Sequence, residues 1–171
     1  MKSTFEQLLE ARARRGAGYL TLLDPDRLSL QELERRAAVC AEAGADGILV
    51  GTSLMLSATR NAELFDRLRT IAEVPVISFP GDAGQVVRTA DAILFLCMVS
   101  GRNPELLIGQ QVRAAPLLKE YGIEVISTAY MLVESGTLTS TEYMSSTRPM
   151  PRDKDDIAMA HALAAQYLGM K

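Results

Sequence analysis

Histidine and cysteine are scarce in this sequence of 171 residues, and their scarcity excludes several kinds of active site. The one histidine, His161, lies among alanines in a helical pattern, so a Ser/His/Asp or Cys/His catalytic arrangement around it is not credible. The two cysteines, Cys40 and Cys97, stand in apolar surroundings without C-x-x-C spacing. We expect both to be buried free thiols of a cytosolic protein.

Long apolar segments and clusters of positive charge are also missing. No apolar run approaches about 20 residues, the length that spans a membrane, and the N-terminus is amphipathic rather than secretory. The formal net charge is −3, and no basic stretch is interleaved with aromatic residues. We therefore expect a cytoplasmic protein without a transmembrane segment and with no nucleic acid as partner. Its length fits one domain over residues 1–171.

Five short runs rich in Ile, Val and Leu are the most regular feature of the sequence. They do not alternate polar with apolar residues, which is typical of parallel strands buried on both faces. Helical patterns lie between most of them, so the sequence predicts the α/β class with parallel strands. The strands are expected within residues 18–24, 46–51, 74–81, 91–99 and 122–130.

Capping residues and glycines predict the bounds of three helices, at 29–44, 103–122 and 153–169. The first opens with a capping box made by Ser29 and Glu32, and Pro116 is expected to kink the second. Residues 131–152 lack a regular pattern and are expected to form an extended excursion or a hairpin.

A doubly wound sheet and a (β/α)8 barrel share this succession of elements. No strand is followed by G-x-G-x-x-G or by a Walker A motif, which weakens the nucleotide-binding sheet. The predicted strands end on small and polar residues, and barrels carry their chemistry at that end of the strands. This arrangement would place Asp24 and Ser53 around one mouth.

The sequence D-P-D at residues 24–26 ends the first predicted strand. Pro25 favours extended geometry for Asp24 and so fixes the direction of its carboxylate, which could bind Mg²⁺. The alternative is a simple turn, since Asp and Pro are both common in turns. Asp26 is expected to shape the following loop.

Two further loops follow predicted strands. In Gly51-Thr52-Ser53 the glycine permits close backbone approach, and the hydroxyl groups could bind phosphate or metal-bound water. Residues 79–84 contain two glycines and could enclose a ligand. Both loops also have the composition of ordinary turns.

Six stretches, in this order, carry a resemblance to a known family: "LTLLDPD", "GADGILVGTS", "PVISFPG", "ADAILFL", "RNPELLIGQQVRAAPLLKEYGIEVISTAY" and "TRPMPRDKDDIAMAHALAAQYLGMK". The sequence resembles the geranylgeranylglyceryl phosphate synthases, which include related bacterial prenylglyceryl phosphate synthases. The resemblance implies a modified (β/α)8 barrel that joins the C3 hydroxyl of sn-glycerol 1-phosphate to a polyprenyl diphosphate and releases diphosphate. It also implies a requirement for Mg²⁺ and a homo-oligomer.

The resemblance assigns roles to residues at three strand ends. Asp24 and Ser53 would hold the metal, and Thr52 would be a neighbouring substrate-binding residue. Tyr130 would line the active site as a catalytic residue. The prenyl chain would lie in an apolar groove beside strands three and four, with Phe79, Pro80 and Gly81 in its wall.

The chain contains five strand candidates, whereas members of the family continue into three more strands. We therefore expect the first five strands of the barrel, with the metal and diphosphate half of the site and an unpaired edge on strand five. The alternatives are a truncated, non-catalytic fragment of such a barrel or another phosphate-handling barrel enzyme. An aldolase is disfavoured because no lysine stands at a strand end.

Overall fold

The computed structural model describes residues 2–51 and 58–171, and a parallel sheet organises them. Five strands are hydrogen-bonded in chain order, each parallel to the next. The five predicted strands are confirmed, although each is shorter than its apolar run. They are β1 (Leu20–Leu23), β2 (Gly47–Val50), β3 (Val76–Ser78), β4 (Ala92–Cys97) and β5 (Glu124–Ala129).

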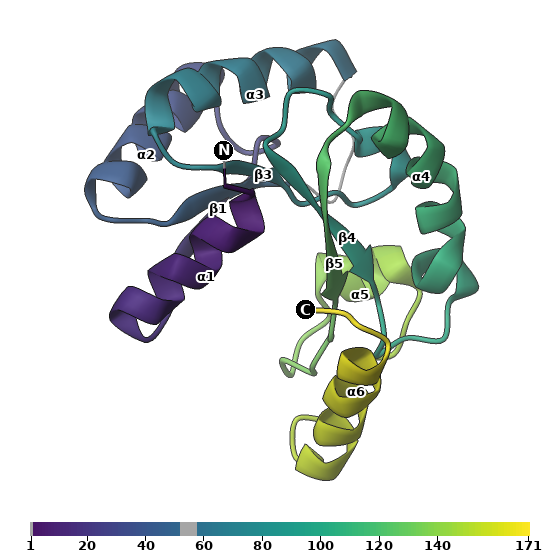
Figure 1. The fold of residues 1–171 in the computed structure, drawn as a ribbon. Helices are drawn as coiled ribbons and strands as arrows, with labels where there is room; N and C mark the ends of the chain where they lie inside the picture. The colour runs from purple at the N-terminus through teal and green to yellow at the C-terminus, as the bar shows by residue number, and fades with distance from the viewer. Residues whose placement is uncertain (1, 52–57) are drawn as a thin grey trace.

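The helices give the sheet its shape. In Figure 1, α2, α3 and α4 form an arc outside the strands, with α1 and α6 below its two ends. Parallel strands in sequential order with helices outside them match the first units of a (β/α)8 barrel, as predicted. The helices are α1 (Thr4–Arg15), α2 (Leu30–Glu42), α3 (Ala58–Ala72), α4 (Gln110–Tyr121), α5 (Ser140–Ser145) and α6 (Asp155–Tyr167). None of these, in the described ranges, is long and apolar enough to cross a membrane.

Both faces of the sheet are packed. On the outer face, Ile48 and Val76 are fully buried against α2 and α3, in a cluster with Leu33 and Leu68. On the inner face, a second cluster joins Ile77, Ala92 and Ile126 to Phe5 and Leu8 of α1. Successive strand residues point to opposite faces of the sheet. In a strand that is packed on both faces, polar residues therefore do not alternate with apolar ones. This packing explains the continuous apolar runs of β2 and β3, whereas Leu22 of β1 and Val125 of β5 are exposed, contrary to the expectation of strands buried on both faces.

Helix α1 is attached to the first residue of β5. The carboxylate of Glu124 accepts hydrogen bonds from the backbone N–H groups of Thr4 (2.5 Å) and Phe5 (2.9 Å). A carboxylate is favourable there because unpaired N–H groups leave the start of a helix partly positive. Since Glu124 begins β5, α1 is anchored toward the N-terminal ends of the strands, and the opposite ends remain free for a site.

The predicted start of α2 is confirmed, but its capping box is half formed in the described structure. The Ser29 hydroxyl accepts a hydrogen bond from the Glu32 N–H at 3.2 Å. The carboxylate of Glu32 instead accepts hydrogen bonds from Arg35 and Arg36, which lower the pKa of Glu32 to about 2. Beyond the helix, Gly44 has a φ of 87°, the left-handed conformation expected of a terminating glycine.

The helix predicted over 103–122 is divided. A π-helical segment, η2 (Glu105–Gly109), precedes α4, and its Leu106 carbonyl accepts hydrogen bonds from the Met98 N–H and the Gln111 side chain. Such wider turns are frequent at functional sites. Gly122 ends α4 as predicted. Pro116 lies inside α4, and the kink there remains a prediction.

The hairpin interpretation of residues 131–152 is wrong. Val133 and Met150 form a parallel bridge, closed by hydrogen bonds from Glu134 N–H to Met150 O (2.8 Å) and from Met150 N–H to Leu132 O (2.9 Å). A hairpin would be antiparallel, whereas a parallel bridge needs a crossover, which here contains α5. The last helix, α6, begins at Asp155, two positions later than predicted.

The edge of β5 is partly occupied, contrary to our expectation. The Lys171 N–H donates to the Ser127 carbonyl (2.8 Å), and the Ala129 N–H donates to the Lys171 carbonyl (3.1 Å). These two bonds flank Thr128 as a parallel neighbour would. Lys171 therefore pairs with β5 in the manner of an added strand.

Candidate functional site

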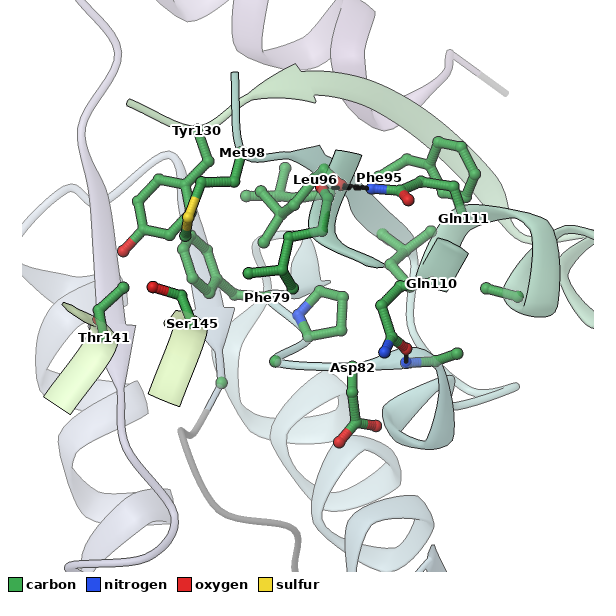
Figure 2. Close-up of a pocket in the computed structure, with 18 of the residues that line it drawn as sticks. Phe79, Asp82, Phe95, Leu96, Met98, Gln110, Gln111, Tyr130, Thr141 and Ser145 are labelled. Atoms are coloured by element: carbon green, nitrogen blue, oxygen red, sulfur yellow. Dashed lines mark hydrogen bonds between the residues drawn. The ribbon is translucent and has the colours of Figure 1, made fainter. Parts of the chain in front are cut away.

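A cavity of about 310 Å³ opens at the C-terminal ends of the strands. Five of the predicted site residues line it: Asp24, Phe79, Pro80, Gly81 and Tyr130. In Figure 2, Tyr130, Thr141 and Ser145 lie at one end of the cavity, and Gln110 and Gln111 lie at the other. Apolar side chains from β4, including Leu94, Phe95 and Leu96, line the cavity as well. The cavity thus has the size and the mixture of apolar and polar lining typical of small-molecule sites.

Asp24 both forms a turn and lines the cavity. Its Oδ1 accepts a hydrogen bond from the Asp26 N–H (3.0 Å), and its Oδ2 lies 3.4 Å from the Arg27 Nε. The side chain keeps 38% of its area exposed. Asp26 is exposed and does not line the cavity. The D-P-D motif therefore makes a local turn that also presents one carboxylate to the cavity.

Asp24 by itself would leave most positions around a bound ion to water and substrate, a mode of binding that Mg²⁺ accepts. Among residues 2–51 and 58–171, no three His, Cys, Asp or Glu side chains are grouped so that they could hold an ion. Mg²⁺ often takes only one or two carboxylates and completes its octahedral shell with water and substrate phosphates. A partly exposed carboxylate at a cavity mouth suits that mode of binding.

Gly51 brings the ends of β2 and β3 into close contact. A Cβ atom at this position would lie 2.1 Å from the Phe79 carbonyl oxygen and 2.8 Å from its Cβ. Only glycine permits this approach, as predicted from the sequence. Thr52 and Ser53, the predicted substrate and metal residues that follow, lie outside the described residues.

Phe79 and Tyr130 meet at the ends of β3 and β5. Their rings are edge-to-face, with centroids 6.0 Å apart and an interplanar angle of 85°. The Tyr130 N–H also donates to the Cys97 carbonyl at the end of β4 (2.8 Å). Figure 2 shows the Tyr130 hydroxyl on the same side as Thr141 and Ser145. The aromatic pair thus leaves a hydroxyl at the polar end of the cavity.

The loop after β3 is a packed wall whose backbone donors are already bound. Gly81 N–H donates to the Gln85 side chain (2.9 Å), Ala83 N–H to Gln110 (2.8 Å) and Gly84 N–H to Asp82 (2.7 Å). A phosphate cradle needs unbound N–H groups. Gly81 and its neighbours are therefore better suited to van der Waals contact with a ligand than to binding a phosphate.

Helix α5 forms another wall, which the sequence did not predict. Thr141 and Ser145 are four residues apart, so they share one face of the helix. The Ser145 hydroxyl lies 2.7 Å from that of Thr147, and Thr147 contacts the sulfur of Met98. The Asn103 side chain donates to the Ser145 carbonyl (2.8 Å). These bonds tie α5 to the segments that follow β4.

Two glutamines at the start of α4 are the other unpredicted lining residues. Gln110 accepts the hydrogen bond from Ala83 described above. Gln111 is 7% exposed and donates to the carbonyls of Leu96 and Leu106, while its own carbonyl oxygen has no partner among the described residues. The π-helical turn before them left no recognisable pattern in the sequence.

The cysteines and the histidine lie outside the lining of this cavity. Cys97 is buried as predicted, and its thiol donates to the Leu107 carbonyl (3.3 Å). Burial raises the pKa of this thiol. Cys40 is only half-buried, so the expectation of two buried thiols is half right. His161 contacts the Ile157 carbonyl of its own helix (2.7 Å) and Arg102 (3.4 Å), in agreement with a packed helix residue.

Residues 7–171 match the PcrB family. The chain is 43% identical to geranylgeranylglyceryl phosphate synthase of Chitinophaga pinensis over 167 residues, which are 98% of this chain and 66% of that protein. It is 38% identical to the enzyme of the same name from Thermofilum pendens over 164 residues, or 96% of this chain and 64% of that protein. The chain thus spans about two thirds of the length of these relatives.

A solved structure gives the same result for the fold. The crystal structure of (S)-3-O-geranylgeranylglyceryl phosphate synthase from Thermoplasma acidophilum, in complex with its substrate sn-glycerol-1-phosphate, superposes with a TM-score of 0.92. The identity is 32%, and the match covers 99% of this chain and 68% of that chain. The parallel strand order is consistent with these matches, and the chain belongs to the PcrB family.

Proposed function

We propose that the protein transfers a prenyl group from a polyprenyl diphosphate to the C3 hydroxyl of sn-glycerol 1-phosphate and releases diphosphate. The observation that carries this proposal is a cavity lined both by polar side chains, among them Asp24 and Tyr130, and by the apolar side chains of β4. A prenyl diphosphate has the same division, because its diphosphate is charged and its chain is hydrocarbon. The named relatives are synthases of the corresponding product.

The reaction breaks the allylic C–O bond to diphosphate and forms an ether bond to the glycerol oxygen. Bound Mg²⁺ would neutralise the negative charge that develops on the diphosphate. Asp24 would hold this ion, with Ser53 as the second proposed ligand and Thr52 as a substrate contact. Tyr130 would position the reacting groups through its hydroxyl, while a base accepts the glycerol proton.

The apolar wall has a second task, which is to keep water from the allylic carbon. Phe79, Pro80 and Gly81 would form the wall nearest the diphosphate, where Phe79 is held by Tyr130. The hydrocarbon chain would then follow Leu94 and Leu96 of β4. Exclusion of water would direct the allylic carbon to glycerol rather than to hydrolysis.

The proposal is tested by incubating the full-length protein with sn-glycerol 1-phosphate, geranylgeranyl diphosphate and Mg²⁺, and measuring prenylglyceryl phosphate by mass spectrometry. We expect product with sn-glycerol 1-phosphate, much less with its enantiomer sn-glycerol 3-phosphate, and none after chelation of Mg²⁺. Folded protein that forms no product from prenyl diphosphates of several lengths would contradict the proposal.

Self-association is a further part of the proposal. Helix α6 exposes Met159, Leu163 and Tyr167, which recur every fourth residue and so share one face. An exposed apolar stripe of this kind suits a contact between copies of the protein. Light scattering of the full-length protein, with and without Leu163→Glu, tests whether this face contributes.

A further inference from the structure

The end of the cavity opposite Tyr130 lies between two elements that are far apart in the sequence. One is the short 3-10 helix η1 (Ala83–Gln85), and the other is the start of α4. Figure 2 shows Gln110 and Asp82 together at this end. The dashed line beside Gln110 marks the hydrogen bond that its side chain accepts from the Ala83 N–H of η1. Gln110 thus connects two walls of the same cavity.

The pairing of β3 with β4 is short. Their register contains two pairs, Ile77 with Ala92 and Ser78 with Ile93, and no pair is formed beyond Ser78. Val86, Ile93 and Ala114 line the cavity and also belong to the cluster packed under α4. The cavity therefore extends from the inner face of the sheet toward the helix layer.

A hydrogen bond from the Ala83 N–H to the Gln110 side chain crosses this extension between η1 and α4. Gln110 Oε1 accepts the Ala83 N–H at 2.8 Å, whereas the N–H groups of Gly81 and Gly84 are bound by Gln85 and Asp82 of the same loop. Gln110 therefore adds a hydrogen bond between η1 and α4 to the apolar packing of Ala83 against the cluster that contains Leu118. Removing it would leave the Ala83 N–H without its acceptor, and η1 could move away from α4.

We propose that Gln110 is a positioning residue that limits the length of the prenyl chain by holding η1 against α4. This inference rests on the proposed function, because it assumes that the apolar extension holds the hydrocarbon chain. In this proposal, the intact Gln110–Ala83 bond closes the far end of the cavity, so that the last isoprene unit stops there. Without the bond, an additional unit can pass between η1 and α4.

The test compares two substitutions of similar size in the full-length protein. Gln110→Met removes the acceptor, whereas Gln110→Glu keeps an oxygen that can accept the Ala83 N–H. For each protein, kcat/KM is measured with geranylgeranyl diphosphate and with a diphosphate one isoprene unit longer. We expect the ratio of longer to shorter substrate to rise about tenfold or more in Gln110→Met, and to stay near the original value in Gln110→Glu.

A merely structural role would give a different result. In that case Gln110→Met would lower the melting temperature and reduce kcat/KM for both substrates equally, so an unchanged ratio overturns the inference while the proposed function stands. An equal rise of the ratio in both variants also overturns it, since the acceptor would then be irrelevant. If the unaltered protein transfers no prenyl group, the proposed function fails and this inference fails with it.

Discussion

Phe79 and Tyr130 form an edge-to-face pair with ring centroids 6.0 Å apart, although one follows β3 and the other follows β5. The pair spans β4 at the polar end of the cavity, where the Tyr130 N–H is bound to the Cys97 carbonyl. The Tyr130 ring is therefore held by two neighbouring strands, and its hydroxyl is placed by the sheet rather than by the loop that carries it.

Tyr130→Phe separates the role of the hydroxyl from that of the ring. The ring contact with Phe79 remains, so we expect an unchanged melting temperature and a fall in kcat/KM of roughly 100-fold. Phe79→Leu is the matched variant, because it removes the aromatic pair, worth about 0.5–1.5 kcal/mol, and keeps the hydroxyl. Full activity of Tyr130→Phe would remove Tyr130 from the catalytic residues.

Asp24→Asn tests the proposed metal ligand without disturbing the turn. The amide oxygen of Asn can still accept the Asp26 N–H, so the fold should be retained. Loss of the charge should weaken Mg²⁺ binding, and we expect activity to fall at least about tenfold at limiting Mg²⁺. Asp26→Asn is the control, since Asp26 does not line the cavity. Normal turnover by Asp24→Asn at limiting Mg²⁺ would disprove the assignment.

Gly51→Ala should destabilise the protein by roughly 1–3 kcal/mol, because the new Cβ would meet the backbone carbonyl of Phe79. Gly18→Ala is the control, since its nearest atoms would be 3.8 Å away, an ordinary contact. Urea unfolding of the two variants gives the comparison. Equal stability of both would show that β2 and β3 can separate at their ends without cost.

Glu124→Ala should detach the start of α1 from β5. Two backbone N–H groups lose a charged acceptor, and we expect a loss of roughly 1–3 kcal/mol of stability. Hydrogen exchange should rise first in residues 4–8. Glu120→Ala is the control, because Glu120 is exposed on α4. Unchanged exchange in α1 would mean that its apolar contacts alone hold it in place.

The buried thiol of Cys97 predicts a dependence on alkaline pH. Burial disfavours the thiolate, so the pKa of Cys97 is raised in the folded protein. The stability that this neutral thiol contributes is complete below the unfolded pKa of about 8.5, and it is lost as the pH rises through the folded pKa. We expect the melting temperature of the unaltered protein to fall as the pH rises above this value. In Cys97→Ala the melting temperature should fall less steeply. An identical decline in the variant would exclude Cys97 as its cause.

Local signals in the sequence were sufficient to predict the five strands and several helix ends. Apolar runs marked β1 to β5, and in β2 and β3 the reason is that strands packed on both faces need continuous apolar side chains. Gly44 and Gly122 marked helix ends because glycine adopts the left-handed conformation found there without steric strain. The position of Asp24 at a strand end also followed from its neighbours in the chain, as did the close approach allowed by Gly51.

Tertiary structure decided which residues face one another across the cavity. The Phe79–Tyr130 pair, the bond from Ala83 to Gln110 and the attachment of α1 to Glu124 each join segments distant in sequence. The η2 segment makes a similar contact, because its Leu106 carbonyl accepts a hydrogen bond from the Met98 N–H that follows β4. Hydrogen-bond partners supplied from elsewhere in the fold leave no periodic pattern, so the sequence by itself determined the strands and three of the helices, and the packed fold determined which residues line the cavity.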